Sequence, residues 1–456
     1  MARSATITFG GAVVFGLAFA GACESADDSS QIFGFEVIVS DSGGERPFGI
    51  TALSGGSLAV THQEAAGTLS ILDSNGDGTF SIRQEIATDA FAPMGTEGVG
   101  RGIVPGDFDG DGDLDLVMSD TVELDTIPLC ENTPNARGSN IIVFLNDGGT
   151  FTFSEALTGG LRAQTPAVGD VDGDGNLDIV IDNRHGDFCE PPEGTVPNTG
   201  LDTEAPNEDD RRNGIGNAQV FLGNGDGTFD DNGSFGACTS AHFLAMADLN
   251  EDGFADVAMP CNIDEGPVAV LFGSNSGALE GQVDLNVDPA TVPRPHAVKT
   301  ADLNGDGNMD IVAANTNREF PAVSAFLGDG AGGFTVAPNS RFSLGADLDG
   351  LGSSFLEVAD ITGPDGIQPD GVLDLVLGKN TGDADVQNFI LILAGDGSGG
   401  FTHVTNLGSP FAVGPGINLR QIAVADFNDD GLPDVATEEF GTSDPIRRNI
   451  VVLLHR

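Results

Sequence analysis

The chain has 456 residues, and its 70 Asp and Glu against 18 Lys and Arg give a formal net charge of −52 at pH 7. A field of this sign repels nucleic acid and anionic membrane surfaces, so we expect neither as a direct partner. The 66 Gly and 29 Phe, with no Trp and no Tyr, are typical of a turn-rich β protein that lacks the aromatic side chains most often stacked on sugars.

The first 22 residues predict a secretion signal that is not part of the fold. Arg3 precedes an apolar run over residues 7–19, and this run is too short to span a bilayer comfortably. The segment ends in A-G-A-C, which resembles a bacterial lipoprotein box ending at Cys23, although Ala20 stands where leucine is usual.

Two outcomes of export stay open. In the first, residues 1–22 are removed and Cys23 carries a lipid, so that residues 23–32 form an anchor and short tether at the bacterial outer membrane or cell surface. In the second, cleavage after Ala22 or Ala20 releases a secreted protein. In both cases any contact with the membrane is made only through a lipid.

After the tether, residues 33–39 (F-G-F-E-V-I-V) predict a strand, and a unit of four short strands then repeats. One strand of the unit, such as 422–425, runs into an acidic loop, and a second, such as 178–181, leaves it. A third strand, such as 220–222, ends in a Gly-rich hairpin whose Asn-Gly and Asp-Gly pairs suit the positive φ of a tight turn.

The acidic loop is clearest at residues 107–115, which read D-F-D-G-D-G-D-L-D. Side-chain oxygens at its positions 1, 3, 5 and 9 are the ligands that a hard cation such as Ca²⁺ needs, and the glycines at positions 4 and 6 permit the turn. Without a cation these carboxylates would repel one another. Mg²⁺ fits less well, because it demands octahedral geometry and keeps its waters.

Five loops keep this pattern, and we predict a Ca²⁺ ion in each. Their expected ligands, with the residue at position 7 included, are Asp107, Asp109, Asp111, Asp113, Asp115; Asp170, Asp172, Asp174, Asn176, Asp178; Asp248, Asn250, Asp252, Phe254, Asp256; Asp302, Asn304, Asp306, Asn308, Asp310; and Asp426, Asn428, Asp430, Leu432, Asp434. A sixth loop carries an insertion, and we expect an altered site there from Asp360, Thr362, Asp370 and Asp374.

The third-strand signature occurs seven times, once more than the acidic loop. The extra copy belongs to a first unit, residues 50–80, whose loop has decayed to L-S-G-G-S at 53–57 and has no ligands. The hairpin at 73–78 begins like a calcium loop, but Ser81 stands at its ninth position, and we interpret it as a turn. The sequence therefore predicts seven units with five or six metal sites.

Repeated four-stranded units are typical of a β-propeller, for which seven blades is a common count. The last unit stops at Arg456 after its third strand, whereas residues 33–39 form a strand without a unit. Pairing the two would close the ring and leave no exposed edge. We predict an all-β, seven-bladed β-propeller of four-stranded antiparallel blades over residues 33–456, closed by the N-terminal strand in the last blade.

The D-x-[DN]-x-D-G-x-x-D loops, the L-D-[LI]-V strands after them and the G-D-G-x-F hairpins resemble the FG-GAP/VCBS repeats of bacterial surface proteins. Those repeats are similar to the propeller head of integrin α subunits. The resemblance implies that the acidic loops lie on one face of the ring. It implies that the connections between second and third strands, and between blades, lie on the opposite face, which usually meets the partner.

Beside Cys23, four cysteines form an even set in an exported chain, where disulfides persist, although buried free thiols are the alternative. The geometry that the resemblance implies places two enlarged connections on one face of neighbouring blades, so we expect Cys130 to pair with Cys189. Cys238 and Cys261, taken as lying before the first and after the second strand of one unit, should then pair with each other.

One further set of residues lies six positions before the first aspartate of each acidic loop: Arg101, Gln164, His242, His296, Ser354 and Arg420. Two interpretations of this set are open in a chain with so few basic residues. The side chains line the mouth of the channel and attract an anion or an acidic sugar, or they cap strands and offset nearby carboxylates.

These features favour a calcium-binding, secreted or surface-anchored, monomeric scaffold that binds or adheres to a protein or polysaccharide. The alternatives are a polysaccharide-active enzyme, since similar propellers occur in polysaccharide lyases, and a lectin. We predict no catalytic residues, because the six His are scattered and we find no nucleophile elbow, zinc-type His cluster or phosphate-binding glycine motif. A propeller fold by itself does not name the ligand.

Overall fold

The computed structural model describes residues 34–456 except 64–66, 92–97, 123–138, 161–162, 185–214, 264, 287–293, 317–322, 339–351, 364–367, 381–382, 406–408, 417–418 and 439–448. The predicted signal peptide, Cys23 with its tether, and the Cys130 and Cys189 pair lie outside the described residues.

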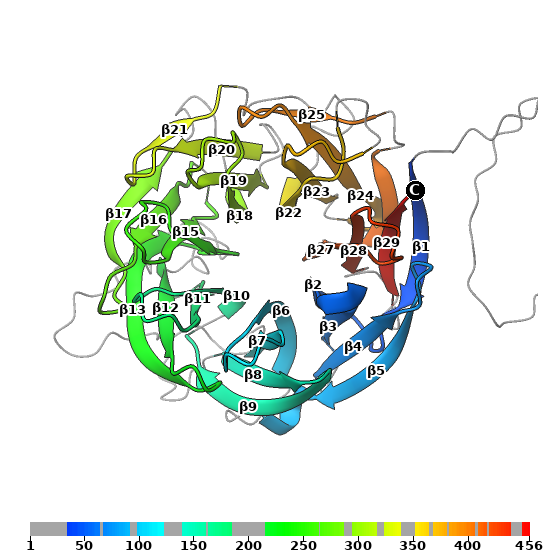
Figure 1. The fold of residues 1–456 in the computed structure, drawn as a ribbon, viewed down its shortest axis with the longest axis horizontal. Coiled ribbons are helices and arrows are strands. Elements are labelled where there is room, and N and C mark those ends of the chain that lie inside the picture. The colour runs from blue at the N-terminus through cyan, green and yellow to red at the C-terminus, as the bar shows by residue number, and fades with distance from the viewer. Residues whose placement is uncertain are drawn as a thin grey trace, which may run out of the picture.

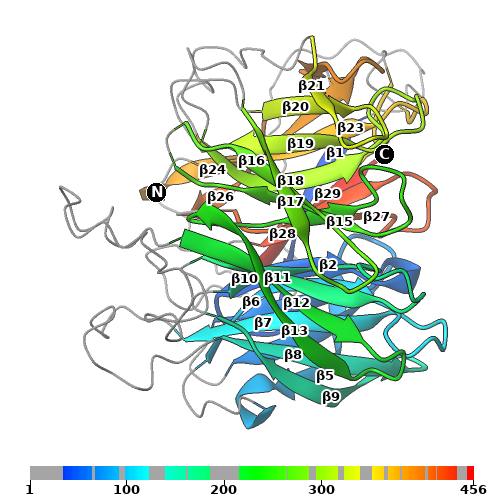
Figure 2. The same cartoon turned by 90° about the vertical axis from the view of Figure 1, so that its left-hand side faces the viewer.

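Seven antiparallel sheets stand around a central axis as the blades of a propeller (Figure 1), and Figure 2 shows the ring edge-on, with the strands running from one face to the other. Blade 1 contains β2 (Pro47–Ala52), β3 (Leu58–His62), β4 (Thr68–Ser74) and β5 (Phe80–Ala87). Blade 2 contains β6 (Gly98–Gly106), β7 (Asp115–Val122), β8 (Asn140–Asp147) and β9 (Thr150–Thr158). Blade 3 contains β10 (Ala163–Gly169), β11 (Asp178–Asn183), β12 (Ile215–Gly223) and β13 (Phe229–Thr239).

Blade 4 contains β14 (Ala245–Ala247), β15 (Asp256–Pro260), β16 (Val268–Phe272) and β17 (Glu280–Leu285). Blade 5 contains β18 (Pro295–Ala301), β19 (Asp310–Asn315), β20 (Val323–Gly328) and β21 (Phe334–Val336). Blade 6 contains β22 (Gly352–Ala359), β23 (Asp374–Asn380), β24 (Asp383–Gly395), β25 (Phe401–His403) and β26 (Phe411–Gly416). Two 3-10 turns, η1 (Ser54–Gly56) and η2 (Thr88–Phe91), complete the regular elements of the first six blades as far as the structure describes them.

Blade 7 confirms the predicted closure of the ring. It contains β27 (Ile422–Ala425), β28 (Asp434–Glu438), β29 (Asn449–His455) and, as its fourth strand, β1 (Phe35–Asp41) from the other end of the chain. β1 pairs antiparallel with β29 from Phe35 opposite His455 to Asp41 opposite Asn449. Figure 1 shows these two strands, blue and red, side by side.

Blade 6 differs from the others in its outermost strand. β25 pairs with one end of β24, at Leu393 to Gly395, while β26 pairs with the other part, from Asp383 to Ile390. Together the two short strands occupy the place of one fourth strand. The four-layer order of the blade is therefore kept.

The hydrophobic core lies between neighbouring blades. In β7, Leu116 and Met118 pack with Ile71 of blade 1, whereas Val117 between them packs with Ile179 of blade 3. A second strand that is buried on both sides needs consecutive apolar residues, which explains the unbroken L-V-M run in place of an alternating pattern.

Cys238 and Cys261 form a disulfide with their Cα atoms 5.1 Å apart, which confirms this predicted pair. Its position differs from the prediction. Cys238 precedes the first strand of blade 4 but lies in β13, the outermost strand of blade 3, so it belongs to the preceding blade. Because β13 continues as far as Thr239, it includes the segment expected to lead into the next unit, and the disulfide links two blades.

Candidate metal centres

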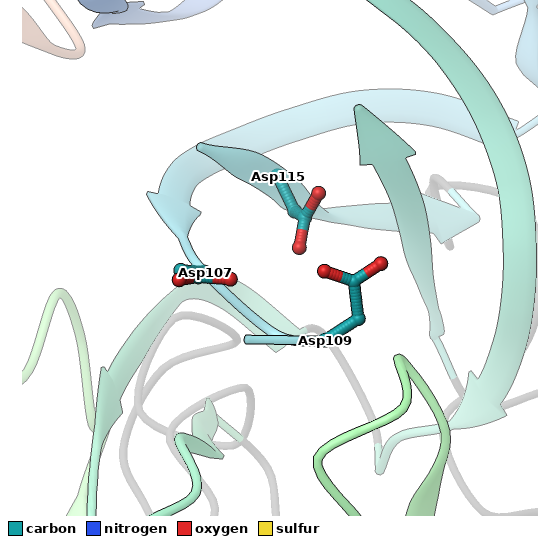
Figure 3. A group of neighbouring side chains, drawn as sticks. All are labelled: Asp107, Asp109 and Asp115. Atoms are coloured by element: carbon teal, nitrogen blue, oxygen red, sulfur yellow. The ribbon is translucent and has the colours of Figure 1, made fainter. Parts of the chain in front are cut away.

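The acidic loop of blade 2 joins the innermost strand β6 to β7. Carboxylate oxygens of Asp107, Asp109 and Asp115 all lie within 4.8 Å of one another, and Figure 3 shows these side chains turned toward a common space. Asp170, Asp172 and Asp174 of blade 3 form a second group of the same kind. The structure thus brings together acids that the sequence pattern predicted as ligands of one ion.

Hydrogen bonds from the backbone wind each loop around its first aspartate. Gly110 and Gly112 donate their N–H groups to the two carboxylate oxygens of Asp107, at 2.9 and 3.1 Å. The two glycines have φ of 74° and 94°, which side chains with a Cβ rarely adopt. Similar bonds to the first aspartate recur in the loops of blades 3 to 5 and 7, so the glycine spacing of the motif is a requirement of the turn.

The aspartate at position 9 is buried in every acidic loop, with 0 or 1 % of its surface exposed: Asp115, Asp178, Asp256, Asp310, Asp374 and Asp434. In blade 2, Phe108 in the loop and Asn146 at the end of β8 each donate an N–H group to Asp115 at 2.8 Å. The same two kinds of donor reach each equivalent aspartate. This carboxylate therefore ties the loop to the third strand.

Burial raises the pKa of these aspartates. The pKa of Asp115 rises to about 6 because the carboxylate is desolvated; the two N–H donors oppose the rise, and the charges of Asp109 and Asp111 add to it. The pKa of Asp434 rises to about 7 for the same reasons, with repulsion from Asp430 and Asp426. A cation at the site would offset both the desolvation and the repulsion.

Blade 6 keeps this framework despite its insertion. Asp370 and Gly371 donate N–H groups to Asp360 at 3.0 and 2.8 Å, as Asp174 and Gly175 do to Asp170. Asp374 accepts N–H groups from Ile361, Thr362 and Gly395. The hydroxyl of Thr362 is buried and has no hydrogen-bond partner among the described residues, so an oxygen remains for a further ligand interaction.

The donor set and its spacing fit calcium. Ca²⁺ takes oxygen ligands at about 2.3–2.6 Å, so two ligands on opposite sides of the ion are at most about 5 Å apart. Carboxylates gathered within 4.8 Å of one another are therefore close enough to bind one Ca²⁺ ion.

The loops also lie at the junctions between blades. Ala255 in the loop of blade 4 donates its N–H to the carbonyl oxygen of Asp170 in blade 3 at 2.7 Å. Gly227 in the blade 3 hairpin donates to the carbonyl of Phe108 in blade 2 at 3.1 Å. Loop geometry in one blade is therefore linked directly to its neighbour.

Blade 1 has no acidic loop, as predicted. Residues 53–57 contain the η1 turn, and the Leu53 N–H closes the loop on the carbonyl of Ser57 at 2.8 Å. The hairpin at 73–78 is the turn between β4 and β5. In it Asp77 accepts hydrogen bonds from the hydroxyl and the N–H of Thr79, which lower the pKa of its carboxyl.

Several of the residues predicted to form a polar ring lie close together in pairs at or beside the innermost strands, and the side chain of Ser354 lies outside the described residues. Arg101 donates to the side-chain oxygen of Gln164 at 3.4 Å, and the rings of His242 and His296 have centroids 4.6 Å apart. Arg420 lies beside the buried Glu438, whose pKa burial raises to about 8 while the charge of Arg420 opposes the rise.

Sequence reasoning missed the member that blade 1 contributes to this ring. Ile50 pairs with Val60 as Ile103 pairs with Met118, so Phe48 corresponds to Arg101. The guanidinium carbons of Arg101 and Arg420 lie 5.3 and 5.1 Å from the centre of the Phe48 ring. A signal was present, because F-G-I at 48–50 matches R-G-I at 101–103. We call the set Phe48, Arg101, Gln164, His242, His296, Ser354 and Arg420 the central ring.

The fold and the loops define the class: a seven-bladed β-propeller with acidic loops between the first and second strands of its blades. A model of the FG-GAP-like repeat matches residues 58–118 and 134–181, which include the acidic loops of blades 2 and 3. The chain thus contains FG-GAP-like repeats within a seven-bladed β-propeller.

Other comparisons add less. A crystal structure of a protein from Lactobacillus plantarum aligns over 79% of this chain and 84% of its own, with 13% sequence identity and a TM-score of 0.48. No curated protein matches the sequence. The part of the chain that the structure describes contains no helix with the length and hydropathy to span a membrane.

Proposed function

We propose that this protein is a calcium-stabilised propeller that acts outside the cytoplasm as a binding scaffold, with no catalysis of its own. The observation that supports the calcium most strongly is the convergence of Asp107, Asp109 and Asp115 within 4.8 Å at the end of an innermost hairpin. Calcium, when bound, supplies the positive charge that these crowded carboxylates lack.

The aspartates at different positions of each loop have different structural roles. Aspartate at position 1 accepts the backbone N–H groups that wind the loop, and aspartate at position 9 holds the loop to the third strand. In blade 2 both present oxygens to the same space together with position 3, and in blade 3 positions 1, 3 and 5 do so. Because the loops bond to neighbouring blades, a filled loop would stabilise the junction as well as its own blade.

Export is supported by two independent features. The N-terminal 22 residues have the layout of a secretion signal. Cys238 and Cys261 form a disulfide between blades, and structural disulfides persist in oxidising compartments. Lipid attachment at Cys23 is one of the two outcomes of export, and metabolic labelling with a fatty acid, lost in Cys23→Ser, would test it.

The test of the calcium proposal is thermal unfolding of the metal-stripped chain in the presence of increasing Ca²⁺, with Mg²⁺ as the matched control. We expect a large rise in Tm with Ca²⁺ and a much smaller one with Mg²⁺. A Tm that does not depend on Ca²⁺ would contradict the proposal.

A further inference from the structure

The central ring is built by a repeated backbone irregularity. In five blades the innermost strand shifts register against the second strand at one level, between Pro47 and Gly49 and at the four equivalent places. Each shift brackets the central-ring member of its blade. A β-bulge redirects a side chain out of the regular alternation, and bulges are frequent beside binding sites.

Blades 7, 1 and 2 are drawn together at this level. The side-chain amide of Gln421 in blade 7 accepts the Ile103 N–H of blade 2 at 3.2 Å and donates to its carbonyl oxygen at 3.3 Å. Gly49 of blade 1 lies beside this pair of hydrogen bonds. The blades approach so closely there that a Cβ at position 49 would lie 2.4 Å from the carbonyl oxygen of Arg101. Arg101 and Arg420 are thereby held in fixed positions against Phe48.

Cationic side chains gather at this end of the strands, opposite the acidic loops. The described residues include nine Lys and Arg, and six of them lie at this end, one in each blade except blade 4: Arg46, Arg101, Arg184, Arg294, Lys379 and Arg420. Arg46 is exposed, and Arg184, Arg294 and Arg420 are half-buried. Asp182 and Glu438 lie at the same end and are fully buried, and burial raises the pKa of both carboxyls.

At this end, the residues that the structure describes include no exposed large apolar side chain. The exposed ones among them all lie on outermost strands: Val37, Val39, Ile82, Phe153, Val283 and Val336. Protein interfaces usually depend on buried aromatic or apolar hot spots. Guanidinium groups, in contrast, match the geometry of a carboxylate, and the net charge of −52 favours a ligand with few negative charges.

We propose that the central ring binds a carboxylate-bearing sugar, with Arg101 and Arg420 holding the carboxylate and the buried Phe48 supporting both guanidinium groups. The inference rests on the binding role proposed above and names its ligand class. Arg46, Arg184 and Arg294 add positive potential around the site.

The test uses the calcium-loaded full chain and isothermal titration with a trimer of galacturonic acid. We expect binding of the acid and none of its methyl ester. Arg101→Gln and Arg420→Gln should each weaken binding by about tenfold or more, because each removes a charge-assisted hydrogen bond. Arg101→Lys keeps the positive charge but loses the paired N–H donors of the guanidinium group, so its affinity for the trimer should lie between those of the unaltered chain and Arg101→Gln. Arg83→Gln, which removes an equal charge from outer strand β5, is the control and should bind as the unaltered chain does.

Three results would overturn the inference: no binding of the trimer, equal binding of acid and ester, or affinity unchanged by both arginine substitutions in variants whose Tm shows that they are folded. The last would also reveal a sugar held by calcium in the acidic loops. If one of these results is found and the Tm still depends on calcium, the sugar proposal fails but the proposed calcium-stabilised scaffold does not. If the Tm does not depend on calcium, the proposed scaffold function fails instead.

Discussion

Blades 1 and 2 share the arrangement of their innermost hairpin, but the aspartate that joins the loop to the third strand lies on different segments in the two blades. In blade 2 the loop carries the acid, and Asp115 accepts an N–H group from Asn146 at the end of the third strand. In blade 1 the loop carries Ser57, which donates its hydroxyl to Asp73 on the third strand at 3.3 Å. Asp73 also pairs with Arg83 at 3.3 Å. A buried acid creates a need for a cation, whereas a neutral loop with an exposed ion pair does not.

Blade 1 is held instead by its neighbours. Phe48 lies against the guanidinium groups of two adjacent blades, and Ser74 donates its hydroxyl to the carbonyl of Phe427 in blade 7. Metal and contact between blades are therefore alternative ways to fix an innermost hairpin.

The largest effect should come from pH in metal-stripped protein, because the aspartates at position 9 titrate together. Burial raises their folded pKa above the unfolded value of about 3.9, to about 6 at Asp115 and about 7 at Asp434, so the folded state holds protons more tightly. The stability that these groups contribute should be complete below about pH 4 and should fall as the pH rises toward 7. With Ca²⁺, which binds the ionised form, Tm should rise over this range. Parallel pH profiles with and without Ca²⁺ would contradict this.

A single substitution in blade 2 should have the next largest effect. Asp115→Ala leaves the N–H groups of Phe108 and Asn146 without their acceptor, at about 1–3 kcal/mol each in the free energy of unfolding. Ser57→Ala in blade 1 removes one hydrogen bond, worth about 1 kcal/mol. Urea unfolding in Ca²⁺ measures both. Equal losses would mean that the two loops are not held differently.

Blade 1 should respond to crowding at its innermost strand. Gly49→Ala places a Cβ 2.4 Å from the Arg101 carbonyl oxygen and against Gln421, and overpacking of this kind costs about 1–3 kcal/mol. Gly378→Ala is the matched control, because its Cβ would meet no atom closer than 3.5 Å. Urea unfolding of the two variants would refute the crowding if both lose the same stability.

The smallest effect should come from the fourth loop position. Glu251 in blade 4 has φ of 57°, where blade 2 has Gly110. A side chain in this region costs about 1 kcal/mol, so Glu251→Gly should raise the free energy of unfolding by up to that amount. Thermal unfolding in Ca²⁺ detects a gain of this size, and a loss of stability would show that the Glu251 side chain contributes a contact that outweighs its strain.

Most of the fold could be predicted because each unit carries its own local signals. The glycines of the acidic loop indicate tight turns, and consecutive apolar residues indicate strands buried on both sides. The unpaired strands at the two ends of the chain predict that the ring closes by pairing them. The candidate ligands of blades 2 and 3 converge as the spacing implied.

The remaining features depend on pairing between segments far apart in the sequence. Phe48 was missed because blade 1 has no loop aspartate from which to count. The blade of Cys238 was misassigned because the length of β13 is set by its pairing with β12 and not by a local pattern. The two-part outer strand of blade 6 depends in the same way on which part of β24 each segment reaches.

The most direct measurement is the number of calcium ions that the stripped and reloaded chain takes up at saturation, determined by equilibrium dialysis. Five regular loops and one altered loop predict at least five ions per chain, with one fewer in Asp115→Ala and no change in Ser57→Ala. A chain that is folded and retains no calcium would contradict the view that the acidic loops are metal centres.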